Sequence, residues 1–571
     1  MPDTPGTADT PATSDTPTAA PNAWLEPVRS FTEQLVRVRA FSPTTDERTV
    51  AQTILDLLLS GDLETAYTAI GLDPIEDDPF GRRNVFAFVQ GRRAETVVLL
   101  GHFDTVDTAD YGTLEPWATD PAGLAARVAD LAAVTPGLRE DLDAHPDDWM
   151  LGRGSIDMKS GIAANLAVIR DCARAAARGT PPAVSVLFLA TPDEENESAG
   201  VLQAVRFLLR LRGERALTYL GAINTDYTTA QHPGDPHRYV YTGTIGKLLP
   251  SFLVVGRESH VGDPFDGLDA NLLAAALIQD LSMNDDLCDR VRGQATPPPV
   301  TLRAADLKAR YDVQLPFAAY FYLNVLTFRT GPAELLERMR LHAEAALSRV
   351  LERLDHAERL WRSGGDGAPP PWDTPPRSGV VLTYDELRRR AEERLGTDRV
   401  AAELAEEWDR WPDALDKRER SLHLVRRLWA CGGERGPAVV VYYSPPYYPH
   451  VAAAPGALHA AVDRVVAAHP ELNLVQREYY PYISDMSYLR LDPGVDTAAL
   501  TANMPVWRAP TAPARGGAYT LPLDDIRALD LPVVNLGPYG RGAHQRGERV
   551  LMSYSFGVLP RLIHEVIESL A

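Results

Sequence analysis

The chain has 571 residues, of which 45% are hydrophobic, so it is long enough for two or more globular domains. Its formal net charge of -21 disfavours nucleic-acid phosphates and anionic lipid surfaces as partners. Cys172, Cys288 and Cys431 lie far apart, which argues against a disulfide framework and a thiolate zinc site and favours a reducing compartment.

The first 22 residues are rich in Pro, Thr, Asp and Ala and predict a disordered tail, because they cannot bury enough apolar surface to fold. They contain neither a basic opening nor an apolar run. No later stretch reaches the about 20 apolar residues that cross a bilayer. We therefore expect a soluble, cytoplasmic protein without a membrane partner.

From residue 23 onward, helical patterns alternate with short apolar runs at 95–100, 183–190 and 217–224. A helix is predicted over 160–179, closed by Gly179. This alternation predicts an α/β fold in which helices flank a central, mostly parallel sheet. In such folds, the loops that follow the strands carry the chemistry.

The first of these loops is GHFDTVD, directly after the run 95–100. The two-residue strand period places His102 and Asp104 on the same side. A carboxylate behind a histidine fixes the tautomer whose other nitrogen can bind a metal ion. Taken alone, so short a motif is more often a surface histidine beside a turn aspartate.

Two further loops offer carboxylates. Asp157, in GRGSIDMKSG, lies near the start of the helix 160–179, where it is either a metal ligand or an ordinary acidic cap. Glu194 and Glu195 follow the run 183–190. Neighbouring acids can divide their roles between cation ligand and general base, although acidic loops are usually only solvated.

Two more candidate ligands complete the set. Asp226 follows the run 217–224, and His544 lies in a glycine-rich turn after the strand-like residues 531–537. Each has an ordinary interpretation as a turn residue. Two histidines and several acids, each placed after an apolar strand, are together a donor set suited to zinc or manganese.

The ordered set resembles the co-catalytic zinc family of acetylornithine deacetylases, succinyl-diaminopimelate desuccinylases, aminoacylases and glutamate carboxypeptidases. The strings GHFDTVD, WATDP, GRGSIDMKSG, FLATPDEENES and SHVGDPFDGLDAN carry the resemblance, which spans about Trp24 to Ala571. Within the family, the long chain is most similar to the arginine-utilisation branch. The resemblance implies an α/β catalytic domain with an inserted α+β lid that also serves dimerisation.

The resemblance also implies two divalent metal ions, most often zinc, with manganese and cobalt as alternatives. Asp157 would bridge the ions, His102 and Asp226 would complete the ligands of one, and Glu195 and His544 those of the other. Many relatives have Glu or His at the position of Asp226, which makes it the least secure ligand.

Four further residues receive roles through the resemblance. Glu194 would be the general base and Asp104 the partner of His102. His260, on the lid, would stabilise the reaction oxyanion, in some dimeric relatives across the subunit interface. Arg329 would hold a substrate carboxylate. Alternatively, His260 is an ordinary loop histidine ahead of a helix, and Arg329 is an exposed charge at the end of a strand. The segment YISDMS around Asp485 departs from the family's glycine-rich pattern.

Composition sets the expected domain limits. A tail (1–22) precedes the first part of the catalytic domain (23–242), an inserted lid (243–452) and the second catalytic part (453–571). Within the lid, 363–379 is a Pro/Gly-rich loop and 380–435 a helical elaboration of unknown role.

The expected function is hydrolysis of an amide bond in a small N-acyl amino acid or short peptide, with arginine or amino-acid catabolism implied only by the resemblance. One alternative is a metal-binding but inactive regulatory or binding protein. A serine hydrolase on a similar sheet is disfavoured, because no GxSxG elbow follows a strand.

Overall fold

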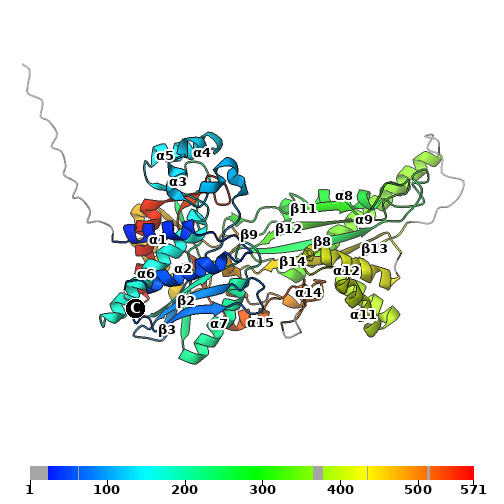
Figure 1. Cartoon of the computed structure of the whole chain (residues 1–571). Coiled ribbons are helices and arrows are strands. Elements are labelled where there is room, and N and C mark those ends of the chain that lie inside the picture. The colour runs from blue at the N-terminus through cyan, green and yellow to red at the C-terminus, as the bar shows by residue number, and fades with distance from the viewer. Residues whose placement is uncertain (1–22, 62, 364–376, 434, 511–514, 571) are drawn as a thin grey trace, which may run out of the picture.

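The computed structural model describes residues 23–61, 63–363, 377–433, 435–510 and 515–570 (Figure 1). The predicted tail, 1–22, and most of the predicted Pro/Gly-rich loop, 364–376, lie outside the described residues. Within the described ranges, two large sheets organise the chain, one of eight strands and one of five.

The eight-stranded sheet is the centre of the catalytic part. Its middle strands pair in parallel, whereas the pairs at the β1 edge and between β16 and β7 are antiparallel. In spatial order the strands are β1 (Ala69–Pro74), β2 (Arg83–Val89), β5 (Ser185–Thr191), β3 (Glu95–His102), β6 (Thr218–Asn224), β16 (Val533–Asn535), β7 (Arg238–Tyr241) and β15 (Leu474–Arg477).

Helices cover both faces of this sheet, because its strands are apolar on both sides. Along β3, Val97 and Leu99 point into one core, and Val98 and Leu100 into the other. The first core is closed by α1 (Leu25–Arg37), α2 (Glu47–Leu59), α6 (Ser160–Ala177), α13 (Ala457–Ala468) and α16 (Leu559–Ser569), and the second by α7 (Ala199–Arg215) and α15 (Leu523–Leu529). The predicted α/β class is confirmed.

A smaller unit is inserted between β3 and α6. It contains α3 (Pro121–Ala125), α4 (Val128–Val134) and α5 (Leu138–Ala144), which share a small apolar cluster with β4 (Trp149–Leu151). Strand β4 then pairs with β18 (Arg549–Leu551), which in turn pairs with β17 (Gly540–Arg541). This three-stranded sheet ties the segment before Asp157 to the turn that carries His544.

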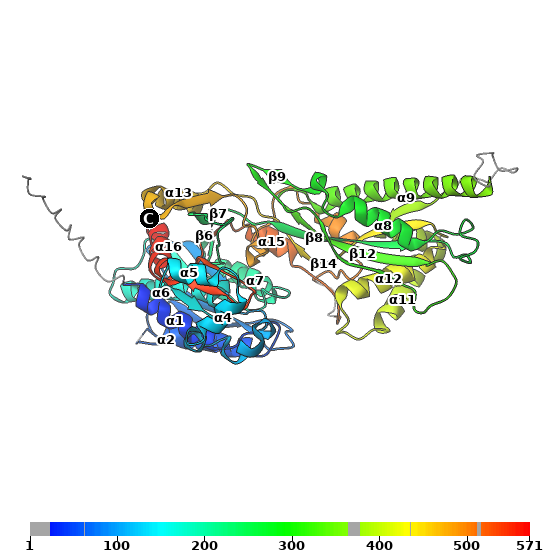
Figure 2. The same ribbon diagram turned by 90° about the horizontal axis from the view of Figure 1, so that it is seen from above.

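The five-stranded sheet lies within the predicted lid, residues 243–452, and is called the lid sheet below. Its spatial order is β11 (Val300–Asp306), β12 (Ala318–Thr327), β8 (Gly246–Val255), β14 (Ala438–Tyr448) and β13 (Val380–Thr383). Figures 1 and 2 show it extending to one side of the catalytic sheet. The proposed domain limits, 243 and 452, enclose these strands.

Two sets of helices cover the lid sheet on opposite faces (Figure 2). One face carries α8 (Ala270–Leu281) and α9 (Pro332–Arg362). The other carries the helical elaboration, which consists of α10 (Tyr384–Leu395), α11 (Thr397–Asp409) and α12 (Lys417–Gly432). A short hairpin of β9 (Arg290–Val291) and β10 (Gln294–Ala295) follows α8.

The lid and the catalytic sheet share one apolar core rather than meeting only at a flexible link. Leu187 of the catalytic sheet and Phe252 of the lid belong to the same buried cluster. The residues after β15 connect them, because α14 (Thr497–Ala502) packs on α9 while α15 packs on α7. Lys417 of α12 also forms an ion pair with Glu197 in the loop after β5.

None of the helices in the described ranges combines the length and the apolar character needed to cross a bilayer. The longest, α9, has an exposed face carrying arginines and glutamates that pair with one another.

Candidate metal centre

The parallel pairing of β5, β3 and β6 brings the predicted donors to one edge of the sheet. His102 ends β3 and pairs in register with Thr191 of β5. Leu100 of the same strand pairs with Asn224 of β6. The loop with Glu194 and Glu195 and the loop with Asp226 therefore leave the sheet beside His102.

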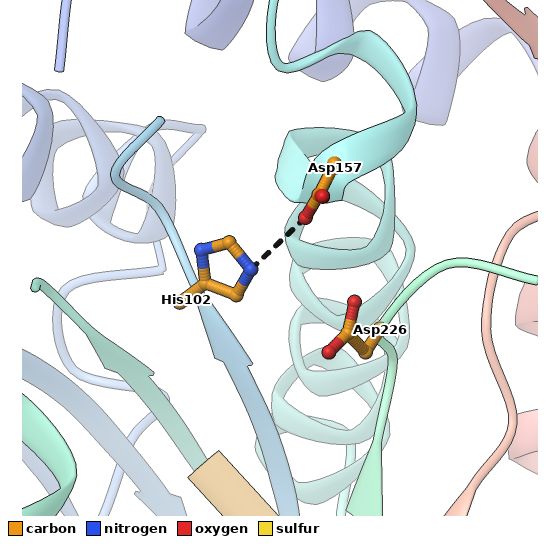
Figure 3. A group of neighbouring side chains, drawn as sticks. All are labelled: His102, Asp157 and Asp226. Carbon is orange, nitrogen blue, oxygen red and sulfur yellow. Dashed lines mark hydrogen bonds and ion pairs between the residues drawn. The ribbon is translucent and has the colours of Figure 1, made fainter. Parts of the chain in front are cut away.

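The first donor group consists of His102, Asp157 and Asp226 (Figure 3). All three are buried, and each offers one ligand atom, with the three atoms within 4.8 Å of one another. His102 Nε2 lies 3.1 Å from Asp157 Oδ1.

The second donor group consists of Asp157, Glu195 and His544. His544 Nε2 lies 3.2 Å from Asp157 Oδ2 and 2.8 Å from Glu195 Oε1. Asp157 thus directs one carboxylate oxygen to each group. This is the geometry expected of a carboxylate that bridges two ions.

A buried acid fixes the backbone that carries Asp157. The Glu548 carboxylate accepts hydrogen bonds from the backbone N–H groups of Ile156, at 3.2 Å, and Asp157, at 3.3 Å. Glu548 also pairs with Arg153 Nη1 at 2.7 Å, and both side chains are almost fully buried. This pair could not be predicted from the sequence, because nothing local connects residues so far apart in the chain.

Asp104 connects the first donor group to the Glu194–Glu195 loop. One of its oxygens lies 3.4 Å from His102 Nδ1. Its two oxygens also accept the backbone N–H groups of Glu194, at 3.1 Å, and Glu195, at 3.0 Å. One buried carboxylate therefore orients both the imidazole and the adjacent acids.

The carboxylates at the two donor groups outnumber the basic side chains beside them. Burial, strengthened by Asp157, raises the pKa of Asp226 to about 7. Burial also raises the pKa of Glu194 well above its ordinary value, and Glu195 adds to this in spite of the nearby His102. Hydrogen bonds to Asp157 and Glu195 raise the pKa of His544 to about 11. A further positive charge at this place would be strongly stabilised.

The donor set fits divalent metal ions. Two ligands of a tetrahedral zinc ion are roughly 3.3 Å apart, given zinc–ligand distances of about 2.0–2.1 Å. The three donor separations given above, 3.1, 3.2 and 2.8 Å, are close to this value. Imidazole nitrogens and carboxylate oxygens suit zinc, manganese and cobalt.

A cavity of about 320 Å³ opens beside the donors and lies between the two sheets. The catalytic part contributes most of its walls, and the lid strands β8 and β14 contribute Lys247, Pro446 and Tyr448. The remaining lining residues are Asp157, Glu194, Glu195, Asn196, Asp226, Tyr227, Tyr482, Ile483 and His544.

Four sequence-predicted residues do not line this cavity. His102 and Asp104 are buried at the first donor group, whereas His260 and Arg329 lie elsewhere in the chain's structure. His260 is exposed, and its Nδ1 accepts the backbone N–H of Gly262 at 3.0 Å. It follows the end of β8 that is farther from the cavity, since Lys247 and Val255 are eight residues apart, or roughly 26 Å along the strand. Arg329 is exposed just beyond β12, and its backbone N–H donates to Asp289.

Sequence reasoning missed the lid residues of the cavity. Lys247 and Tyr448 are cross-strand partners in the lid sheet, and only this pairing brings them together. Tyr227 could have been found, because it directly follows Asp226. Asp485 is buried and accepts a hydrogen bond at 2.9 Å from the hydroxyl of Thr191, the last residue of β5.

The model of Peptidase family M20/M25/M40 matches residues 98–502. The chain is 34% identical over 511 residues to the uncharacterized protein YqjN of Bacillus subtilis (strain 168), covering 88% of each chain. It is 32% identical over 563 residues to protein RocB of the same strain, covering 95% of this chain and 94% of RocB. A succinyl-diaminopimelate desuccinylase of Methylibium petroleiphilum is 32% identical over 190 residues, or 33% of this chain and 41% of that enzyme.

Among solved structures, aminopeptidase PepT from Bacillus cereus ATCC 10987 aligns with 96% of this chain and 98% of its own, at 13% identity and a TM-score of 0.49.

Proposed function

The chain belongs to peptidase family M20/M25/M40, and from this we propose that it uses two divalent metal ions, zinc by preference, to hydrolyse an amide bond of a small N-acyl amino acid or short peptide. Membership makes it a metal-dependent hydrolase of amide bonds and confirms the resemblance inferred from the motifs. The observation that carries the two-ion proposal is the Asp157 carboxylate, with one oxygen toward each histidine.

Two bound ions would supply Lewis-acid chemistry, which would polarise the substrate carbonyl and make water more acidic near neutral pH. His102, Asp157 and Asp226 would hold one ion, and Asp157, Glu195 and His544 would hold the other. Asp104 keeps the His102 ring oriented through Nδ1.

Glu194 moves the proton. Its carboxylate lines the cavity but belongs to neither donor group, and its Oε2 lies 3.9 Å from His102 Nε2. Burial raises its pKa, so the carboxylate can take a proton from water and return it to the departing nitrogen. This free acid favours an enzyme over the alternative of an inactive metal-binding protein.

We further propose that the enzyme acts as a homodimer. His260 lies too far along the lid to reach the cavity of its own chain, so an oxyanion role requires a second subunit. The lid sheet ends at β11, where one edge of the strand pairs with no other described strand. Leu302 and Val300 of this strand are 53% and 45% exposed. Such an edge is suited to pairing with another strand.

The metabolic setting and the cellular location of the enzyme are two finer parts of the proposal. A place in arginine or amino-acid catabolism rests on the likeness to the arginine-utilisation branch, which includes RocB. A reducing, cytoplasmic location is supported by Cys172, Cys288 and Cys431, all of which are free.

Metal analysis and a hydrolysis screen test the proposal together. We expect about two zinc, manganese or cobalt ions per chain, and turnover of at least one N-acyl amino acid or dipeptide. Asp157→Ala should lose most of the metal, because it removes a ligand of both ions. Full metal content in that variant would refute the bridge, and a metal-loaded protein without turnover on any amide would favour the inactive alternative.

A further inference from the structure

Lys247 is the feature of the cavity that the reaction above does not use. Its side chain reaches the cavity from β8, the first strand of the lid, next to Tyr448 on β14. Apart from the candidate ligand His544, it is the one basic side chain among the described residues that line the cavity. The other ionisable groups there are carboxylates and tyrosines.

The amine of Lys247 lacks a partner in the part of the chain that the structure describes. Among the described residues, no carboxylate, hydroxyl or carbonyl is placed to pair with it, although the side chain is partly buried. Burial lowers the pKa of Lys247, and the charge of Arg418 lowers it further. Arg418 itself is paired with Asp416. Lys247 therefore bears the cost of burial without compensation from the protein.

The nearby acids do not supply that compensation. Asp157, Glu195 and Asp226 direct their oxygens toward the two donor groups, and Glu194 lies beside His102. An anion that enters the cavity would meet an amine whose charge is unmatched. Hydrogen bonds between charged groups are stronger than neutral ones, most of all where water is excluded.

We propose that Lys247 binds an anionic group of the substrate, a carboxylate carried on one side of the scissile amide, and so selects anionic over neutral amides. This inference rests on the proposed amidase function. It gives the lid a direct part in substrate recognition within its own chain. Arg329, which the motif resemblance assigned to a substrate carboxylate, does not line this cavity.

Matched substrate pairs test the inference. One arm compares each N-acetyl amino acid with its C-terminal amide, so that the carboxylate lies on the amine side of the bond. The other compares N-succinyl with N-butyryl amino-acid amides, so that it lies on the acyl side. In one arm, the wild-type enzyme should prefer the anionic member by about 10- to 100-fold in kcat/KM, the range of one charge-assisted hydrogen bond.

Lys247→Met removes the charge at similar length and should reduce that preference to within about threefold, mainly through a higher KM for the anionic member. Lys247→Arg should retain most of the preference. Arg29→Gln is the matched control, because it removes one positive charge from the exposed face of α1 and should leave the preference intact.

The preference is a ratio measured on one sample, so partial unfolding of a variant does not change it. A preference that survives in Lys247→Met would overturn the inference, as would a wild-type enzyme that does not discriminate in either arm. If the metal-loaded wild type hydrolyses nothing, the proposed function fails instead. Calorimetric binding of N-acetyl and N-succinyl ligands to wild type and Lys247→Met then decides the role of Lys247 separately.

Discussion

Replacing Asp104 with asparagine would test whether one buried carboxylate organises the metal centre. Asp104 accepts two backbone N–H groups, those of Glu194 and Glu195, and faces His102 Nδ1. An asparagine has one acceptor oxygen and an amide nitrogen that only donates. It can keep one of the two backbone hydrogen bonds, but its NH₂ group would oppose the other N–H.

The expected losses of stability and metal affinity follow from the hydrogen bond and the negative charge that the asparagine cannot supply. A hydrogen bond to a charged group contributes about 1.5–3 kcal/mol, and the orphaned N–H lies in the Glu194–Glu195 loop next to the metal ligands. Loss of the carboxylate beside a ligating histidine typically lowers metal affinity by about 10- to 100-fold. We therefore expect Asp104→Asn to lose both metal affinity and turnover, and to unfold at lower denaturant concentration.

Competition with a chelator measures the affinity, and steady-state kinetics at saturating metal separates weak binding from misplaced groups. Asp107→Asn is the matched control, because Asp107 is exposed three residues away and caps only the N–H of Ala109. If Asp104→Asn kept metal affinity and turnover within about twofold of wild type, as Asp107→Asn should, the orienting role of Asp104 would be wrong.

Three further predictions concern other parts of the site. Glu194→Gln should keep its metal but lose about a hundredfold or more in turnover, whereas Glu195→Gln should weaken metal binding; metal analysis and kinetics would show an exchange of these phenotypes if the roles are reversed. His260→Ala should lower turnover at unchanged metal content, and mixing it with Glu194→Gln subunits should restore activity if the histidine acts across a dimer; verified heterodimers without rescue would count against that. Glu548→Gln leaves Arg153 without its closest buried partner, so denaturant unfolding should show a loss on the order of 3 kcal/mol.

The α/β class could be predicted from the sequence because the information is local. The runs at 95–100, 183–190 and 217–224 became β3, β5 and β6 with shifts of one or two residues at their ends. The predicted helix ends two residues before Gly179, which has a φ of +81° and terminates it as expected. Strand burial and helix termination depend on neighbours in the chain, which a sequence displays.

The candidate donors could be proposed for a related reason. Each lies within a short string directly after a strand, and parallel pairing then brings those strand ends together. By contrast, the interaction of Glu548 with Arg153 and with the backbone at Asp157 joins residues almost four hundred positions apart. The lid wall of the cavity depends on the register between β8 and β14. No periodicity in either segment reports such long-range contacts.

The shared core of lid and catalytic sheet bears on how this protein denatures. A lid held by a linker alone would melt as a separate unit, with its own midpoint. Here α14 packs on α9 of the lid, α15 packs on α7 of the catalytic part, and apolar residues of both sheets belong to one buried cluster. Unfolding of either sheet would therefore expose apolar side chains of the other. Calorimetry should record a single cooperative transition. Metal that stabilises the folded state through ligands on the catalytic sheet should then raise the midpoint of this one transition, and with it the unfolding temperature of the lid.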